Sequence, residues 1–526
     1  MSVRKYLLSV LGTALLAFGL IGPAVSTGTP AGNAKFAMSP AQMLARGPLP
    51  KNAATYAKAK AKAKLAASSA GRRAEAATPP TPNVPVPFVE WEGVKDEGVT
   101  PSDSTGAIGP TRYVELVNLN FSIYDRTGTE LSTGTLNTLA GRPESDFIFD
   151  PQVIWDPQTQ RFYYAMDDVV GNFANSLLAF GWSKTATPTT AADFCQFTFD
   201  YPGDLFPDYP KLGDSQTWGL IGSNVFDPPG FGFVRSDVMW FKKPPSGEAC
   251  NAPQTGLKTD LRDQTGTGTF TPIPAQSTDA RTALLDGAII SNDPYDPGEQ
   301  NFLTRFLVSD TAAGPFIENP GRSIPIPLYT FPANADQPGL PGSVDSLDAR
   351  VTQAVSARDP RFGQVAVWTQ HTVGGGGGAE VRWYEVNPRA ATVLQSGVVT
   401  NPALDIFNGA ISPDRANNGV TQDYGSNMVL GFNTSSLTEF IDIQMVSKIG
   451  GAAQSAPVLV EASAGETFDH SCCPNRWGDY ASATPDPAAA QGGATGAVWL
   501  TTQWTDDSPP GNTDTDWRTR NWGATP

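Results

Sequence analysis

Residues 150–166, DPQVIWDPQTQRFYYAM, carry the pattern from which the fold is predicted. Two short runs of β-branched and aromatic residues, 153–156 and 161–166, flank a polar turn at 157–160. Runs of this length on either side of a Pro-containing turn indicate an antiparallel β-hairpin. The same arrangement pairs residues 113–118 with 121–125, and residues 365–368 with 381–386 across the glycine tip at 374–378. Almost no stretch has helical periodicity, so we predict an all-β protein.

An aspartate recurs just ahead of the first strand of each predicted unit. The series is Asp103, Asp150, Asp208, Asp279, Asp348, Asp405 and Asp479, with gaps of 47, 58, 71, 69, 57 and 74 residues. Periods of roughly 40–50 residues are typical of four-stranded propeller blades, and longer periods fit blades with extended loops. We therefore predict a single β-propeller of about seven four-stranded antiparallel blades, with six as the alternative. The apolar residues 86–91 would supply the strand that closes the ring.

The N-terminal part of the chain differs from this domain. Arg4 and Lys5 precede an apolar run at 6–21 and small residues that end at Ser26. This pattern predicts a signal peptide at 1–26 and a secreted protein, extracellular, periplasmic or at the cell surface. Residues 27–85 are rich in Ala, Lys and Pro, and we interpret them as a largely disordered leader or linker, with attachment to an acidic polymer or membrane surface as the alternative. The propeller would occupy 86–526, and no later run is long enough for a transmembrane segment.

The predicted propeller is strongly acidic. Residues 1–85 hold 11 Lys and Arg and one acidic residue, which leaves 25 bases against 51 acids and a formal charge of −26. Such a surface repels nucleic acid and suits a soluble extracellular protein, in which calcium is a plausible cofactor.

Four cysteines follow the predicted signal peptide, in a compartment that permits disulfides. Cys195 and Cys250 form the plausible bridge. Cys472 and Cys473 are adjacent, so they form either a vicinal disulfide or bonds elsewhere. A metal cluster with His470 is the weaker alternative, because the chain has only one other histidine, His371.

Four motifs occur in a fixed order along the chain: residues 101–110 (PSDSTGAIGP), 150–156 (DPQVIWD), 208–213 (DYPKLG) and 476–482 (RWGDYAS). In these motifs the chain resembles a group of secreted bacterial β-propeller proteins that are mostly described as hypothetical. The resemblance implies the fold and export. It implies no reaction, since no activity is established for that group. Likeness to sialidases is an analogy of fold only, because their arginine triad and Asp-boxes cannot be placed in this chain.

The first strands of propeller blades line the central channel, so the aspartate series would form a ring of carboxylates. Such a ring can bind a hard cation, act as acid and base on a glycosidic bond, or cap turns. Three members lie in dense motifs and are our candidate catalytic residues: Asp150, Asp208 and Asp479. The candidate substrate-binding residues are Lys211, Arg281, Arg350, Arg476, Trp477 and Tyr480. The two arginines of the repeated Asp-Ala-Arg, Arg281 and Arg350, suit an anionic sugar or else neutralise the ring.

Two functions follow from this pattern. The first is a secreted monomer that engages an extracellular polysaccharide or other glycan at an acidic channel mouth, as a glycoside hydrolase or lyase. The second is a non-catalytic interaction or adhesion module whose carboxylates are structural or bind calcium, with Asp103 and Asp150 as candidate ligands. Most tryptophans would pack between blades rather than stack on sugars. No nucleotide or redox cofactor is indicated, because the P-loop, the dinucleotide fingerprint and the zinc-protease motif are missing from the sequence.

Overall fold

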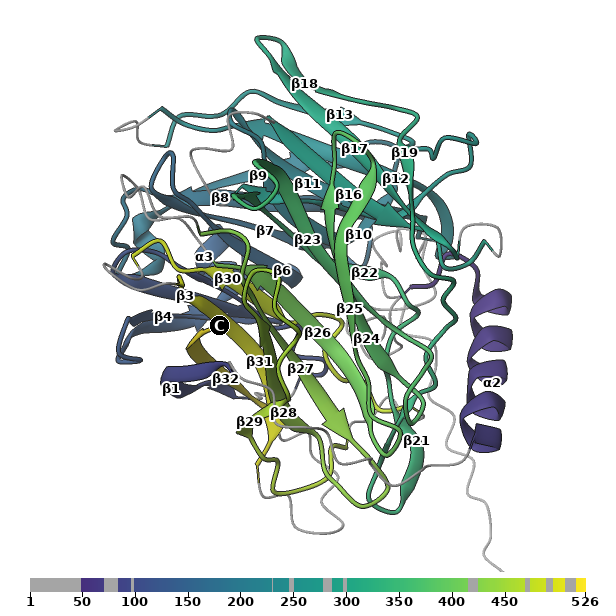
Figure 1. Cartoon of the computed structure of the whole chain (residues 1–526). Helices are drawn as coiled ribbons and strands as arrows, with labels where there is room; N and C mark the ends of the chain where they lie inside the picture. The colour runs from purple at the N-terminus through teal and green to yellow at the C-terminus, as the bar shows by residue number, and fades with distance from the viewer. Residues whose placement is uncertain are drawn as a thin grey trace, which may run out of the picture. The chain divides into compact units, whose positions relative to one another are not determined.

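Seven sheets, each with four antiparallel strands and two of them with a fifth short strand, form the fold in the computed structural model. The structure describes residues 49–70, 84–95, 99–228, 230–245, 250–277, 286–296, 300–414, 424–468, 474–488, 495–506 and 517–526 (Figure 1). The prediction of an all-β propeller with seven blades is confirmed. The first strands of neighbouring sheets contact one another in a closed series: β2, β6, β10, β14, β22, β26, β30 and again β2. These inner strands surround the central channel.

The blades follow one another along the chain. Blades 1 to 3 are β2–β5 (Thr105–Ile108, Arg112–Val117, Asn120–Asp125, Glu130–Thr135), β6–β9 (Phe147–Asp156, Arg161–Val170, Asn175–Ser183, Phe194–Asp200) and β10–β13 (Phe206–Asp214, Trp218–Asp227, Gly232–Lys242, Thr255–Lys258). Blade 4 is β14 and β16–β19 (Phe270–Pro274, Gly287–Asn292, Phe302–Thr311, Gly314–Ile317, Arg322–Pro325). Blade 5 is β15 and β22–β25 (Gln276–Ser277, Val351–Asp359, Gln364–Val373, Glu380–Asn387, Thr392–Val399). Blade 6 is β26–β29 (Asp405–Pro413, Met428–Ser435, Asp442–Lys448, Val458–Glu461).

Blade 7 combines the two ends of the propeller sequence. It contains β30 (Ser482–Pro485), β31 (Val498–Thr505), β32 (Trp517–Thr525) and, as its outer strand, β1 (Val86–Lys95). Strand β1 pairs antiparallel with β32, with Val86 opposite Thr525 and Trp91 opposite Asn521. The predicted closing strand is therefore confirmed, and the hydrogen bonds of one sheet close the ring.

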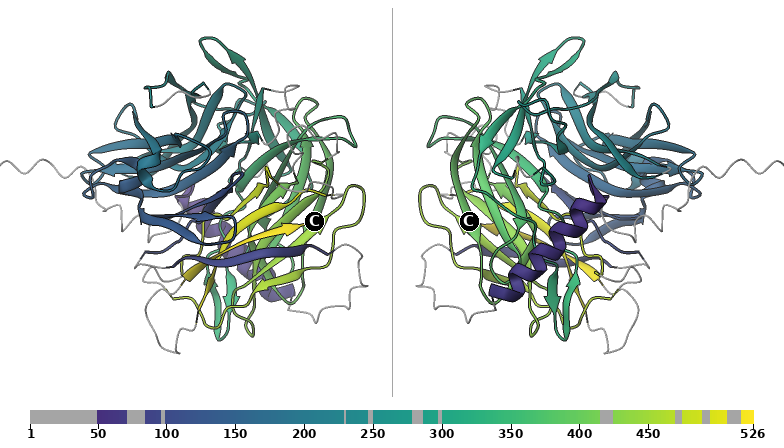
Figure 2. Two further views of the ribbon diagram at one scale, coloured as in Figure 1. Left: turned by 90° about the vertical axis from the view of Figure 1, so that its left-hand side faces the viewer. Right: turned by 90° about the vertical axis from the view of Figure 1, so that its right-hand side faces the viewer.

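Smaller elements lie outside the blades. They are the hairpin β20–β21 (Ala335–Gln337, Leu340–Val344), the helices α2 (Ala53–Ala70) and α3 (Leu136–Ala140), and the 3₁₀ turn η1 (Ala191–Asp193). Helix α2 falls within the segment 27–85 that we interpret as a leader, and it crosses the propeller on one side (Figure 2). Among the described residues, no helix is long and apolar enough to cross a membrane.

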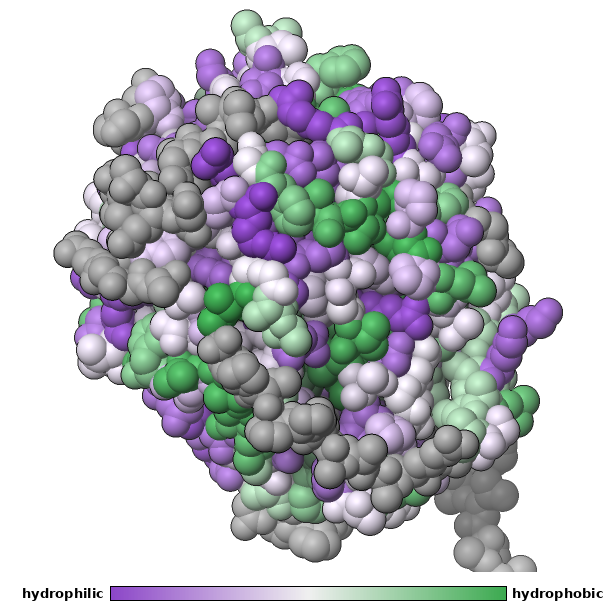
Figure 3. All heavy atoms as spheres, viewed as in Figure 1, coloured by the Kyte–Doolittle hydropathy of each residue, from purple (hydrophilic) through white to green (hydrophobic). Residues whose placement is uncertain are grey.

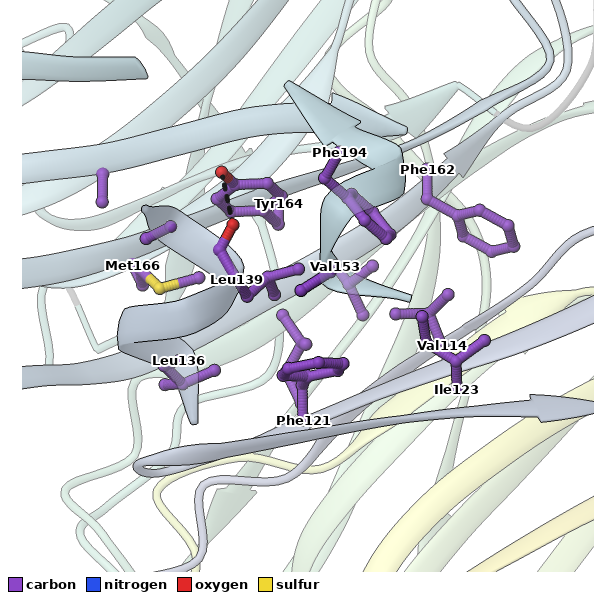
Figure 4. Close-up of a cluster of buried hydrophobic side chains, with 14 of the residues drawn as sticks. Val114, Phe121, Ile123, Leu136, Leu139, Val153, Phe162, Tyr164, Met166 and Phe194 are labelled. Atoms are coloured by element: carbon purple, nitrogen blue, oxygen red, sulfur yellow. Dashed lines mark hydrogen bonds between the residues drawn. The ribbon is translucent and has the colours of Figure 1, made fainter. Parts of the chain in front are cut away.

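The predicted hairpins form as the sequence indicates. Ile154 pairs with Tyr163, Tyr113 pairs with Tyr124, and the 365–368 run lies in β23, which pairs with β24. Side chains of adjacent blades then form the core. Figure 4 shows one such cluster, which includes Phe121 of blade 1, Phe162 of blade 2 and Leu139 of α3. Of eight tryptophans spread over the blades, seven are buried and Trp240 is half-buried (Trp155, Trp218, Trp368, Trp477, Trp499, Trp504, Trp522 and Trp240).

The disulfide between Cys195 and Cys250 is present, with 5.1 Å between the two Cα atoms. It joins β9 of blade 2 to the loop after β12 of blade 3, so it fastens two neighbouring blades. The predictions for His470, Cys472 and Cys473 lie outside the described residues.

The inner strands share a local irregularity near their starts. Six blades have one residue there with positive φ: Asp103, Asp150, Tyr209, Thr271, Ala349 and Asn408. In blades 2, 3, 4 and 6 the pairing register shifts at this point, which is a β-bulge. A bulge bends the strand and redirects its side chains, so the repeated bulge sets how each blade meets the end of the channel that we call the mouth.

A second repeated feature ties three of the inner strands, near their starts, to the preceding blade. The amide oxygens of Asn118 and Asn224 accept hydrogen bonds of 2.8 Å and 2.7 Å from the backbone N–H of Asp150 and Thr271, respectively. Asn292 accepts 3.0 Å from the N–H of Val351 in the same way. Blade 2 has Asp167 at the corresponding register position, opposite Phe149. A carboxyl group therefore replaces the amide at one of these junctions.

Candidate acidic site at the channel mouth

All three candidate catalytic carboxylates lie at the mouth and are buried. Asp150 and Asp208 come from neighbouring inner strands, and their carboxylate oxygens lie within 4.8 Å of each other. Asp479 lies before β30, where it accepts 2.6 Å from Nη2 of Arg476. Asp103 joins this group, because its Oδ1 accepts a 2.6 Å hydrogen bond from the backbone N–H of Asp479. The structure therefore brings these four members of the aspartate series together.

The other members have different positions. Asp348 forms a two-pronged ion pair with Arg350, at 2.7 Å from both Nε and Nη2. Asp405 begins β26 and accepts 2.9 Å from the backbone N–H of Asp336, so it supports the β20–β21 hairpin. Asp279 and Arg281 lie outside the described residues. The ring is thus a cluster centred on blades 1, 2, 3 and 7.

A fifth carboxyl group of the cluster was not predicted from the sequence. Asp167 is fully buried at the end of β7, and its ligand oxygen lies within 4.8 Å of those of Asp150 and Asp208. Neither of its oxygens accepts a well-aligned hydrogen bond from the described residues, although the backbone N–H of Tyr209 interacts with the carboxyl group. It comes from a second strand, whereas our prediction considered only first strands. Asp167 occupies the same position in its blade as Asn118 and Asn224 do in theirs, and this equivalence could have identified it.

Three buried cations lie among these acids. Nζ of Lys211 sits over the rings of Tyr209 and Tyr480, at 3.8 Å and 3.2 Å from their centroids, and has no hydrogen-bond acceptor in the described part of the chain. The Arg350 guanidinium lies 4.8 Å from the Tyr209 ring. Arg476 completes the set. Lys211 is thus held by aromatic faces, Arg476 by the carboxylate of Asp479, and Arg350 by both an aromatic ring and Asp348.

Two predicted substrate-binding aromatics serve blade junctions in this structure. Nε1 of Trp477 donates to Oδ1 of Asn433 at 3.1 Å, and the Tyr480 hydroxyl donates to the carbonyl of Pro151 at 2.9 Å. Both rings are buried. Tyr480 still contributes to the site, because its ring carries Lys211.

Burial sets the protonation of the cluster. It raises the pKa of Asp103, Asp150, Asp208 and Asp479 to about 7 each, and neighbouring carboxylates add to the rise. Burial also raises the pKa of Asp167 well above its ordinary value and lowers the pKa of Lys211 well below. Burial alone would raise the pKa of Asp348, but Arg350 brings it below the ordinary value. Carboxyl groups with a pKa near 7 can donate and accept protons at neutral pH.

A cavity of about 460 Å³ adjoins the cluster. Its lining includes Arg476, Asp345 and Phe233 on the propeller side, and Leu49 and Tyr56 on the other. Arg476 therefore lines this cavity and also binds Asp479. A ligand in the cavity could contact Arg476, which in turn contacts the acidic cluster.

Of the two predicted calcium ligands, Asp150 belongs to a group of three neighbouring carboxyl groups, and the Asp103 side chain interacts with that of Asp150. The group with suitable spacing is Asp150, Asp167 and Asp208. Carboxylate oxygens at this spacing fit a hard divalent cation. Asp103 also uses its carboxylate to accept from Asn118 and from the N–H of Asp479.

His371 lies in β23 and predicts a pH dependence of stability. Its Nδ1 lies 3.1 Å from the carbonyl of Ala349, its Nε2 lies 3.1 Å from the Tyr384 hydroxyl, and burial lowers its pKa from 6.5 to about 3. Between these values the unfolded chain binds a proton that the folded chain does not, so the free energy of unfolding falls as pH falls. From pH 6.5 to pH 5 the expected loss is about 2 kcal/mol.

Urea unfolding of wild type and His371→Gln at pH 7 and pH 5 checks this. The difference in unfolding free energy between the two proteins should shift by about 2 kcal/mol in favour of the variant at pH 5. The comparison of two proteins is needed because the carboxyl cluster has raised pKa values and so acts with the opposite sign. An unchanged difference would contradict a buried neutral imidazole.

No family model and no curated protein matches the chain. Solved structures do resemble it. The hemagglutinin-neuraminidase ectodomain of parainfluenza virus 5 is 10% identical, over 74% of this chain and 84% of that one, with a TM-score of 0.37. The α-L-arabinofuranosidase of Fusarium graminearum is 8% identical over 83% and 97%, with a TM-score of 0.35, and the Dos1 propeller is 8% identical over 83% and 95%, with a TM-score of 0.36. At these scores the likeness carries no argument about the site or its reaction.

Proposed function

We propose that the protein binds an extracellular carbohydrate at the channel mouth and acts on it as a glycoside hydrolase or lyase. The observation that supports this most is the cluster itself: five buried carboxyl groups and three cations at one end of the channel, beside a cavity of about 460 Å³. Residues 1–26, outside the described residues, support secretion, and so does the Cys195–Cys250 disulfide.

The carboxyl pair Asp150 and Asp208 fits the chemistry of hydrolysis. Their oxygens lie within 4.8 Å, which is close to the separation of about 5–5.5 Å in enzymes that retain anomeric configuration. One protonated carboxyl group would protonate the glycosidic oxygen as the C–O bond breaks, while the ionised one attacks the anomeric carbon. Water would then cleave the glycosyl ester and return a proton to the first group.

The cations favour an acidic sugar. Arg476 lines the cavity and its guanidinium is held by Asp479. A guanidinium can bind a sugar carboxylate in a planar, two-point contact. We therefore favour a uronic or other acidic sugar next to Arg476, with Asp479 as the group that orients the arginine.

A second candidate rests on a specific observation, the Asp150, Asp167 and Asp208 group. These side chains are buried, and a divalent cation would offset the repulsion between three neighbouring carboxylates. In this alternative calcium fixes the junction of blades 2 and 3, and the propeller is a non-catalytic interaction module.

One set of titrations separates the candidates. Calcium, then neutral and acidic polysaccharides, are added to the purified protein while thermal unfolding and the release of reducing ends are followed. We expect an acidic polysaccharide to raise the Tm, since selective binding to the folded state stabilises it. The combined Asp150→Asn, Asp208→Asn and Asp479→Asn variant should lose about 100-fold in turnover.

The matched control replaces three exposed aspartates, Asp200, Asp204 and Asp227, by asparagine and so changes the net charge equally. Unchanged glycan binding and turnover in a folded triple site variant would refute the proposal. A rise in Tm with calcium alone, abolished in the site variant and kept in the control, would establish the second candidate.

A further inference from the structure

We infer that residues 49–60 are an internal ligand of the channel mouth, which must leave before an external ligand reaches the acidic site. Leu49 is 4% exposed and packs in the aromatic cluster formed by the starts of the inner strands, including Phe149, Phe206 and Phe270. Its backbone carbonyl accepts a 3.2 Å hydrogen bond from Nη2 of Arg350. One residue thus uses its side chain and its carbonyl to contact the mouth.

Two lysines that follow Leu49 extend this contact along the segment. Lys51 forms an ion pair with Asp293, donates 2.7 Å to the carbonyl of Gly268, and lies 5.4 Å from the centroid of the Phe233 ring. Lys60 lies 3.9 Å from Asp345 and donates 3.1 Å to the Ser346 hydroxyl. The mouth therefore has two acidic positions, Asp293 and Asp345, each occupied by a lysine of the chain's own leader.

An aromatic contact lies between the two lysines. The Tyr56 ring meets the Phe331 ring edge-on, with 6.3 Å between centroids. Together the contacts describe the ligand that the mouth accepts: an aliphatic residue, a cation two residues later, and an aromatic ring on the helix that follows.

The rest of the segment is held loosely, which distinguishes it from a blade strand. No residue of α2 is buried. Pockets of about 460, 400 and 420 Å³, open to solvent, lie along its contact with the propeller. The right-hand edge of Figure 3, where Figure 1 places α2, mixes pale green with purple, as expected for a helix of alanine and lysine.

Residues 49–70 take no part in closing the ring of blades. The closing strand β1 begins at Val86, and its partner is β32. Release of residues 49–70 therefore removes no blade strand. It would uncover Arg350 and Arg476, together with the rings of Phe233 and Phe331.

The inference rests on the proposed function only for the identity of the external ligand that replaces residues 49–60. Its test therefore contains no glycan. A protease recognition sequence is placed between residues 71 and 83 of the full chain, and the N-terminal fragment is removed after cleavage. A synthetic peptide of residues 49–70 is then titrated by calorimetry. We expect one peptide to bind per protein, and the Lys51→Ala peptide to bind about tenfold more weakly, which corresponds to loss of one charge-assisted hydrogen bond.

The control peptide carries Lys58→Ala, because Lys58 is exposed and its replacement should leave the affinity unchanged. Absence of peptide binding, or equal affinity of the Lys51→Ala peptide, would overturn the inference.

Hydrogen exchange on the uncut protein keeps the test independent of cleavage. Amides of α2 should exchange at least tenfold more slowly in wild type than in the Lys51→Ala, Lys60→Ala double variant. Equal exchange in the two proteins would also overturn the inference. If a polysaccharide fails to bind the protein after the N-terminal fragment is removed, that result counts against the proposed function. It leaves the present inference standing, because the peptide titration contains no polysaccharide.

Discussion

Arg350→Ala is expected to lower the free energy of unfolding by about 3–5 kcal/mol, because it leaves a buried carboxylate without its counter-charge. Arg350 is 1% exposed and Asp348 is 0% exposed, and two hydrogen bonds of 2.7 Å join them. Asp348 would keep the Tyr295 hydroxyl as a donor, but a neutral hydroxyl does not replace a guanidinium. Urea unfolding at pH 7 measures the loss.

Arg262→Ala is the matched control. Arg262 also pairs with an aspartate two positions away, Asp260, but both side chains are exposed, at 49% and 40%. Exposed pairs contribute about 0–1 kcal/mol. Adding Asp348→Asn to Arg350→Ala should recover part of the loss, since it removes the orphaned charge. A loss below 1 kcal/mol in Arg350→Ala would show that Asp348 takes up a proton or finds another partner.

The double variant Cys195→Ala, Cys250→Ala is expected to lose about 4 kcal/mol of stability, the loop-entropy estimate for a cross-link of this span. The two cysteines are 55 residues apart, so the reduced unfolded chain gains much conformational freedom. The Cys195 side chain is buried, and alanine at that position also loses a little packing.

Urea unfolding of wild type and of the double variant, each with and without a reductant, tests this. Reductant should lower the stability of wild type. It should not lower that of the double variant by breaking this disulfide, because the variant lacks it. The second comparison also reports any contribution of Cys472 and Cys473. Equal stability of wild type and variant in the oxidised state would contradict a constraining bridge.

The fold was predictable because its signals are local or periodic. Alternating runs such as 153–156 and 161–166 form the hairpins that the pattern indicates. The recurrent aspartates gave the blade number, and the apolar run at 86–91 gave the closing strand. Each signal needs only short-range chemistry and counting.

The site was predictable only in part, because it depends on which side chains meet across blades. Asp150, Asp208 and Asp479 do converge, but Asp405 serves a hairpin elsewhere. Asp167 has no turn or motif around it, and its place follows from register alone. The leader's contact was missed for a similar reason: Leu49 and Lys51 show no periodic pattern, and their partners Arg350 and Asp293 lie more than 200 positions away.

The closing sheet has a consequence for how the chain is made. The hydroxyl of Thr519 in β32 donates to the carbonyl of Val94 in β1 across 425 positions. Contacts of such long range form late and slow folding, and domains fold only as their parts leave the ribosome. Until residue 517 has been synthesised, blade 7 lacks the strand that joins its two halves and the ring stays open. The last strand of the chain to be synthesised is therefore the one that completes the ring.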